Sequence, residues 1–117
     1  MKIQRFEDIS AWKKAKDLSV LVYKHFEHSK DFGFRDQILR ASVSVMNNIA
    51  EGFERKGTKE FKFFLYVAKG SCGEVRSMLI LALELKKISE NDYNLLYNLA
   101  EEISKMIAGL IKSLNTI

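Results

Sequence analysis

The fold is decided by residues 58–85, which read TKEFKFFLYVAKGSCGEVRSMLILALEL. Apolar residues recur here at intervals of three and four rather than in alternation, which predicts one long amphipathic helix. Thr58 is placed to act as its N-cap, and Glu60 adds an acid to the first turn, where the helix dipole favours negative charge. The face that we expect to enter the core carries Phe61, Phe64, Leu65, Ala68, Cys72, Val75, Leu79 and Ala82.

Three further segments show the same helical period, over roughly 8–28, 34–53 and 89–114. We expect Asp8 to cap the first of them and Ser89 to cap the last. The chain has no proline, and the breaks between the segments are short clusters of Gly, Ser, Asp and Asn. Short connections between long amphipathic helices favour antiparallel neighbours. The sequence therefore predicts an all-α protein, an up-down-up-down four-helix bundle.

Length and composition narrow the class of protein. The chain has 117 residues, of which 47% are hydrophobic and 29% charged, so we expect one folded domain over residues 1–117. The longest apolar run, Met78 to Leu83, is far shorter than the roughly 20 residues that span a membrane. Acids stand near the N-terminus where a secretory signal would be apolar, and the single Cys72 leaves no internal disulfide. We expect a cytoplasmic protein without membrane contact.

The segment 58–85 also has a second apolar face, roughly opposite the first. It consists of Phe63, Val67, Met78, Leu81 and Leu85. One bundle cannot bury both faces of one helix, and an exposed patch of this size usually marks an interface. We expect it to join copies of this chain. The alternative is that the face packs under the loop 52–58 or the N-terminal arm of the same chain.

Two glycines, Gly70 and Gly73, stand inside the same predicted helix. Each is expected to cost roughly 1 kcal/mol relative to alanine, so the structure should offset that cost elsewhere. Close approach of a neighbouring helix is the favoured explanation, and a local kink is the alternative.

Positive charge gathers in the first part of the chain. Residues 1–72 hold 14 basic and 9 acidic residues, whereas residues 73–117 hold 5 and 6. The basic residues around the start of the segment 58–85 and along it are Arg55, Lys56, Lys59, Lys62, Lys69 and Arg76. Such a stripe can bind a phosphate backbone with release of counterions, and the nearby Tyr66 can stack on an unpaired base. The alternative is a solvated face that keeps an oligomer soluble.

Signals of enzyme chemistry are weak. His25 and His28 have a spacing that could hold a metal, but a pair interacting with the dipole at the end of a helix is the favoured interpretation. Cys72 lies on the core face, so we expect a packed thiol. The Glu-x-x-His motif, the phosphate-binding glycine motifs and the nucleophile-elbow motif do not occur. We expect no enzyme activity, no metal and no cofactor.

One carboxylate needs a separate explanation. Glu51 follows Asn47 and Asn48 on a largely apolar helix, so we expect it to be partly buried. A buried acid needs hydrogen-bond donors, which these asparagines or a lysine could supply. A structural polar network formed by these three residues is favoured over catalysis.

Three stretches in register carry a family likeness. They are Phe6 to Ile9 with Trp12 and Lys14-Ala15, Ser44 to Phe53, and Thr58 to Phe61 with Phe64 to Ser71. Together they resemble the 23S-rRNA intervening-sequence four-helix-bundle proteins over nearly the whole chain. The family usually has a proline and a serine where this chain has Met46 and Asn47, which puts the helix kink expected from that proline in question here.

The resemblance implies an antiparallel bundle that assembles into a ring, usually a homopentamer, and it implies no established role. Proteins of similar fold, the accessory variability proteins of diversity-generating retroelements, form basic pentameric barrels that bind nucleic acid and a reverse transcriptase. Five copies of this chain, each with a formal charge of +4, would concentrate polyanions. We therefore expect a non-enzymatic homo-oligomer that binds RNA or DNA without strong sequence preference. The alternative is a scaffold that presents its surface to a protein partner.

Overall fold

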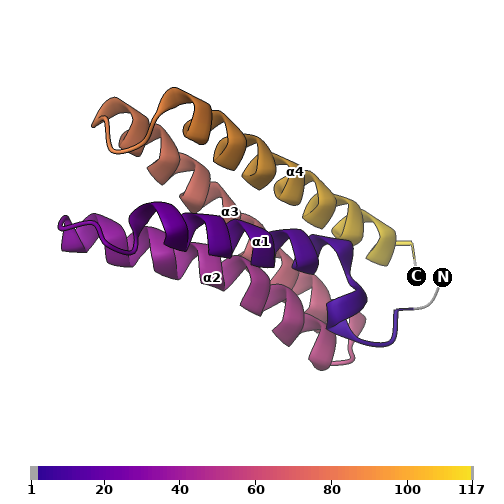
Figure 1. Cartoon of the computed structure of the whole chain (residues 1–117). Helices are drawn as coiled ribbons and strands as arrows, with labels where there is room; N and C mark the ends of the chain where they lie inside the picture. The colour runs from indigo at the N-terminus through magenta and orange to yellow at the C-terminus, as the bar shows by residue number, and fades with distance from the viewer. Residues whose placement is uncertain (1–2, 117) are drawn as a thin grey trace.

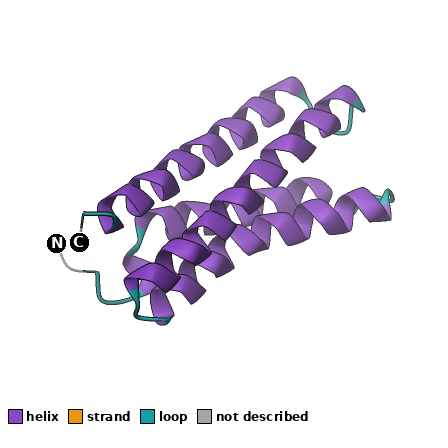
Figure 2. Ribbon diagram, turned by 180° about the vertical axis from the view of Figure 1, so that it is seen from behind, coloured by secondary structure: helices purple, strands orange, loops and turns teal. Residues whose placement is uncertain are grey.

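A computed structural model describes residues 3–116 and consists mainly of four long helices (Figure 1). They are α1 (Ser10–Phe26), α2 (Phe32–Glu54), α3 (Thr58–Glu84) and α4 (Glu90–Leu114), preceded by the short 3-10 helix η1 (Phe6–Asp8). The described residues contain no strand, so the all-α prediction is confirmed (Figure 2). Each helix begins and ends within two residues of its predicted bounds.

The four helices pack side by side into an elongated body of 45 × 22 × 19 Å. Each helix packs against the next one along the chain, and α1 also packs against α4, whereas no Cα atom of α1 lies within 8 Å of one in α3. Figure 1 shows the chain turning back after each helix, with the α2–α3 connection at the same end as η1 and the end of α4. Within residues 3–116, no helix has the combination of length and apolarity needed to cross a membrane.

The core runs along the whole axis between the helices. All four contribute side chains that are fully buried, such as Leu18, Ile38, Leu65 and Ile103. Burial of one such side chain contributes about 1.5–3 kcal/mol. Hydrophobic burial along the predicted faces therefore holds the helices together.

Local hydrogen bonding decides where each helix begins. The prediction for Ser89 is confirmed, since its hydroxyl accepts from the Asp92 N–H at 3.1 Å. The predictions for Asp8 and Thr58 are wrong. Asp8 belongs to η1, and α1 begins after Ile9, which is anchored in the core and has no side-chain cap bond. Gly57, not Thr58, is the N-cap residue of α3.

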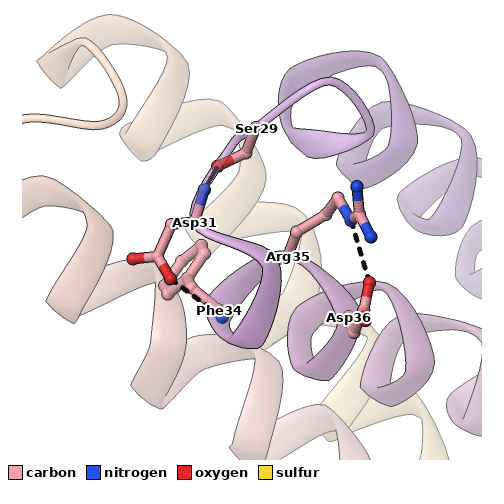
Figure 3. Close-up of polar contacts among 5 residues, drawn as sticks. All are labelled: Ser29, Asp31, Phe34, Arg35 and Asp36. Atoms are coloured by element: carbon pink, nitrogen blue, oxygen red, sulfur yellow. Dashed lines mark hydrogen bonds and ion pairs between the residues drawn. The ribbon is translucent and has the colours of Figure 1, made fainter.

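The start of α2 is capped by Asp31, whose carboxylate accepts from the Phe34 N–H at 3.3 Å (Figure 3). This bond lets α2 begin at Phe32, two residues before the prediction. An ion pair with Lys87 at 3.2 Å, together with the Phe34 N–H, holds the pKa of Asp31 below its ordinary value. From there α2 continues without interruption through Met46.

Candidate functional site

The predicted basic residues begin at the α2–α3 connection and recur along α3, where Lys59 is exposed and Lys62, Lys69 and Arg76 are half-buried. We call Arg55, Lys56, Lys59, Lys62, Lys69 and Arg76 the basic set. Lys56 has a φ of 64°, a left-handed conformation that is uncommon for a residue with a side chain. It occupies the position after the end of α2 where such a conformation reverses the chain. Lys56 therefore lies in this tight connection and Lys59 in the first turn of α3, and both side chains are exposed.

Most of the basic set has no acidic partner. Arg55 pairs with Glu51 at 2.9 Å and lies over the ring of Phe64. The Lys62 ammonium donates to the neutral Asn115 side chain at 2.9 Å, which ties α3 to the end of α4. No carboxylate of residues 3–116 lies within 4.0 Å of the remaining charged groups, those of Lys56, Lys59, Lys69 and Arg76. The positive charge at this surface is therefore largely uncompensated within the chain.

Cys72 lies behind the basic set and is sealed in the core. Its thiol donates to the Ala100 carbonyl at 3.0 Å and is inaccessible to solvent. Burial raises the pKa of Cys72 to about 11, although the charges of Arg76 and Lys69 act in the opposite direction. Since the thiolate is the reactive form, a neutral and buried thiol is a poor nucleophile. The predicted packed thiol is what the structure contains.

The polar network on α2 differs from the prediction. Glu51 is exposed and bound to Arg55, so its predicted partial burial is wrong, and Asn47 is exposed as well. Asn48 is half-buried and donates to the carbonyl and the hydroxyl of Ser44, at 2.8 and 2.9 Å. The hydroxyl of Ser44 is in turn 2.8 Å from that of Ser71 on α3.

The difference follows from the position of Glu51 on the helix. Glu51 lies one turn after Asn47 on the outward side of α2, whereas Ser44 and Asn48 lie on the side that meets α3. The spacing of four residues between Ser44 and Asn48 is the sequence signal that could have identified the network.

The two histidines do not converge on a common site. The Nδ1 atom of His25 is 2.9 Å from the Leu21 carbonyl, and its Nε2 atom is 3.3 Å from a carboxylate oxygen of Asp92. His28 is largely exposed, with its Nε2 atom 3.8 Å from Glu27. Across residues 3–116, the structure contains no group of three His, Cys, Asp or Glu side chains that could hold a metal ion.

The second apolar face of α3 lies at the surface. The side chains of Phe63, Val67, Leu81 and Leu85 are exposed, 62% in the case of Phe63, and we call these four residues the α3 apolar face. The loop 52–58 and the N-terminal arm therefore leave this face uncovered. Met78 is an exception, because only 8% of it is exposed. It lies one turn from both Val75 and Ala82, which are buried, and so reaches the edge of the core.

The helical glycines beside the α3 apolar face have no close neighbour within the chain. A Cβ atom added to Gly70 would meet nothing within 4 Å, and one added to Gly73 would meet only the end of the Arg76 side chain at 3.7 Å. No other helix of the same chain therefore makes the predicted close approach at either glycine.

Comparison with known proteins identifies relatives by family and by fold. Residues 7–109 match the family described as 23S rRNA-intervening sequence protein. A similar solved structure is that of a protein of unknown function from the S23 ribosomal protein family of Bacteroides thetaiotaomicron VPI-5482. It is 26% identical, with a TM-score of 0.82, and the similarity covers 87% of this chain and 98% of that one. No curated protein matches the sequence.

Proposed function

This chain belongs to the 23S rRNA-intervening sequence protein family, and we propose that it is a non-enzymatic, homo-oligomeric protein that binds nucleic acid. In this proposal, up-down-up-down bundles assemble through the α3 apolar face into a cytoplasmic ring. The family resemblance suggests five copies. The basic set then contacts the phosphate backbone of RNA or DNA without strong sequence preference.

The observation that supports this proposal is the presence of two unsatisfied surfaces side by side on α3. One is the α3 apolar face, which soluble proteins usually cover with a partner. The other is the basic set, in which Lys56, Lys59, Lys69 and Arg76 lack carboxylate partners within the described chain. Assembly through the first surface brings several copies of the second together, and phosphate contacts by unpaired cations release condensed counterions.

The Lys62 contact with Asn115 indicates which side of α3 the nucleic acid would meet. This contact places Lys62 toward α4, whereas the hydrogen bond between Ser71 and Ser44 and that between Glu74 and Gln37 define the side of α3 toward α2. Val67 and Leu85 are spaced so that they fall near Glu74 around the helix. Lys62, Lys69 and Arg76 therefore occupy a different sector of α3 from Val67 and Leu85, so assembly need not bury these cations. Lys59 lies one turn before Phe63 and so borders the α3 apolar face.

The test is binding of short labelled single-stranded RNA and DNA at several salt concentrations, with the mass of the protein measured by light scattering. We expect affinity to fall steeply with salt for wild type. The double variant Lys56→Glu, Lys59→Glu should bind all sequences more weakly. Because two phosphate contacts are lost per bound chain, the slope of log affinity against log salt should become shallower by about 1.4 for a single strand.

A matched control changes the charge by the same amount elsewhere. Lys30 and Lys105 are exposed and lie outside the basic set, so the variant Lys30→Glu, Lys105→Glu should keep nearly the wild-type slope. An equal loss in both double variants would show that net charge, and not the basic set, determines binding. If a well-formed oligomer failed to bind at low salt, nucleic-acid binding would be rejected and a protein partner would be sought.

A further inference from the structure

We propose that the C-terminal part of the α3 apolar face of one copy, formed by Leu81 and Leu85, docks into a groove between α1 and α2 of the next copy. The contact is then heterologous, since it joins two different surfaces of the same chain. This inference rests on the homo-oligomer of the proposed function, and it identifies the second half of the interface.

The receiving surface is a hollow of about 370 Å³ on the outside of the bundle. Its apolar lining comes from Val20 and Tyr23 on α1 and from Met46 on α2, and we call it the α1/α2 groove. Val20 is 49% exposed, so its side chain is open to a partner. Lys16, Ser19, Lys24 and Glu27 complete the lining.

The groove and the α3 apolar face lie on either side of α2. On one side, the Ser19 hydroxyl of α1 donates to the Ser42 carbonyl of α2 at 3.0 Å. On the other side, Gln37 of α2 donates to Glu74 of α3 at 3.1 Å. Because α2 lies between the two surfaces, they cannot cover each other within one chain. Two complementary surfaces at different places on one subunit generate a closed ring when the rotation between copies closes.

The Leu81 end of the α3 apolar face lies at a level along the bundle similar to that of the α1/α2 groove, as cyclic symmetry about an axis parallel to the bundle requires, whereas Phe63 and Val67 lie toward the other end. The connections that follow α1 and α3 meet at one end, where Lys87 pairs with Asp31 at 3.2 Å and His25 approaches Asp92 to 3.3 Å. Val20 precedes the end of α1 by about 9 Å, and Leu81 precedes the end of α3 by about 5 Å, at 1.5 Å of rise per residue. Neighbouring copies can therefore join them without sliding along the axis.

Charge favours docking in the α1/α2 groove over docking in a second apolar groove of the bundle. Glu84 stands between Leu81 and Leu85 in the sequence, and no cation of residues 3–116 lies within 4.0 Å of it; Lys24 likewise lacks a carboxylate partner. The other groove, of about 480 Å³ beside the N-terminal arm, includes Asp8 and no lysine. Docking in the α1/α2 groove brings Glu84 toward a lining with two lysines, Lys16 and Lys24, and one acid, Glu27, whereas the lining of the other groove contains Asp8 and no cation.

The experiment uses two variants that each disrupt one surface. Val20→Asp places a charge in the α1/α2 groove, and Leu81→Asp places one on the α3 apolar face. Both side chains are exposed, so circular dichroism should show a wild-type helix content. We expect each variant alone to be monomeric by light scattering. An equimolar mixture should form a complex of two chains, because Val20→Asp retains an intact α3 apolar face and Leu81→Asp retains an intact groove. A mixture that stays monomeric would overturn the proposal.

Other results separate this inference from the proposed function. If Val20→Asp assembled like wild type while Leu81→Asp did not, the groove would be excluded and the α3 faces would pair with each other. If wild type were itself monomeric, both the proposed oligomer and this inference, which rests on it, would be overturned.

A charge exchange gives a second and milder test. Lys24→Glu and Glu84→Lys should each weaken assembly, and the double exchange should restore it. Lys105→Glu, on α4 outside both surfaces, should have no effect on assembly. Failure of the double exchange to restore assembly would contradict the proposed pairing.

Discussion

Gly52 marks a close approach between α2 and α3. A Cβ atom added there would lie 2.7 Å from the Cβ atom of Phe64 and 3.0 Å from a ring carbon of Phe61. The Cβ atom of Phe64 is fixed to its backbone, so a side chain at position 52 must push the two helices apart. Gly109 on α4 is the opposite case, because a Cβ atom added there would meet nothing within 4 Å.

We therefore predict opposite effects for the same substitution at these two glycines. Gly52→Ala should lower the free energy of unfolding by about 1–3 kcal/mol through overpacking. Gly109→Ala should raise it by about 0.5–1 kcal/mol, because alanine loses less conformational freedom in a helix. Urea unfolding followed by circular dichroism at a fixed protein concentration would measure both. A Gly52→Ala variant as stable as wild type would show that α2 and α3 can separate without cost.

The starts of α3 and α4 differ in how their first N–H groups are satisfied. At α4, the Ser89 hydroxyl accepts from the Asp92 N–H, whereas at α3 the N-cap residue is Gly57 and makes no side-chain bond. Ser89→Ala should therefore lower the free energy of unfolding by about 1 kcal/mol. Thr58→Ala is the control and should not lower it, since Thr58 is already inside the helix. Equal losses in thermal unfolding would contradict this assignment of the caps.

Helix α3 presents three surfaces that differ in how far they are buried. Its core face packs against the other helices, its basic residues are exposed at Lys59 and half-buried at Lys62, Lys69 and Arg76, and the α3 apolar face remains open. A helix in a single bundle needs only one apolar face. The extra apolar face on α3 is therefore the feature of this helix that packing within a single chain does not explain.

At the scale of the whole molecule, exposure distinguishes assembly residues from core residues. Phe63 is 62% exposed and Met78 is 8% exposed, although both belong to the apolar face predicted from the sequence. We predict that Phe63→Asp reduces the mass of the assembly and leaves the helix content unchanged. Met78→Asp should instead lower helix content and melting temperature, because it buries a charge in the core.

Light scattering and circular dichroism on the same samples would check this pair of variants. If Phe63→Asp lost helix content as Met78→Asp does, Phe63 would be needed for folding of the chain itself. If Phe63→Asp kept the full mass of the wild-type assembly, Phe63 would lie outside the interface.

Much of this protein could be predicted from local patterns in its sequence. The helical period placed all four helices within two residues of their observed bounds, and the Ser89 cap was evident from its position before Asp92. The excess of apolar residues on α3 was also evident, since a helix's own period decides which side chains share a face. Each of these properties depends on residues that are close together in the chain.

Other properties depend on which helices become neighbours, and only the tertiary structure decided them. Burial of Met78, exposure of Glu51 and the contact between Ser44 and Ser71 all arise from how α2 and α3 are rotated against each other. The α1/α2 groove likewise combines Val20 and Met46, which are far apart in the sequence. The physical reason is that coverage of a side chain is set by packing across the bundle, whereas the formation of each helix is set by its own residues.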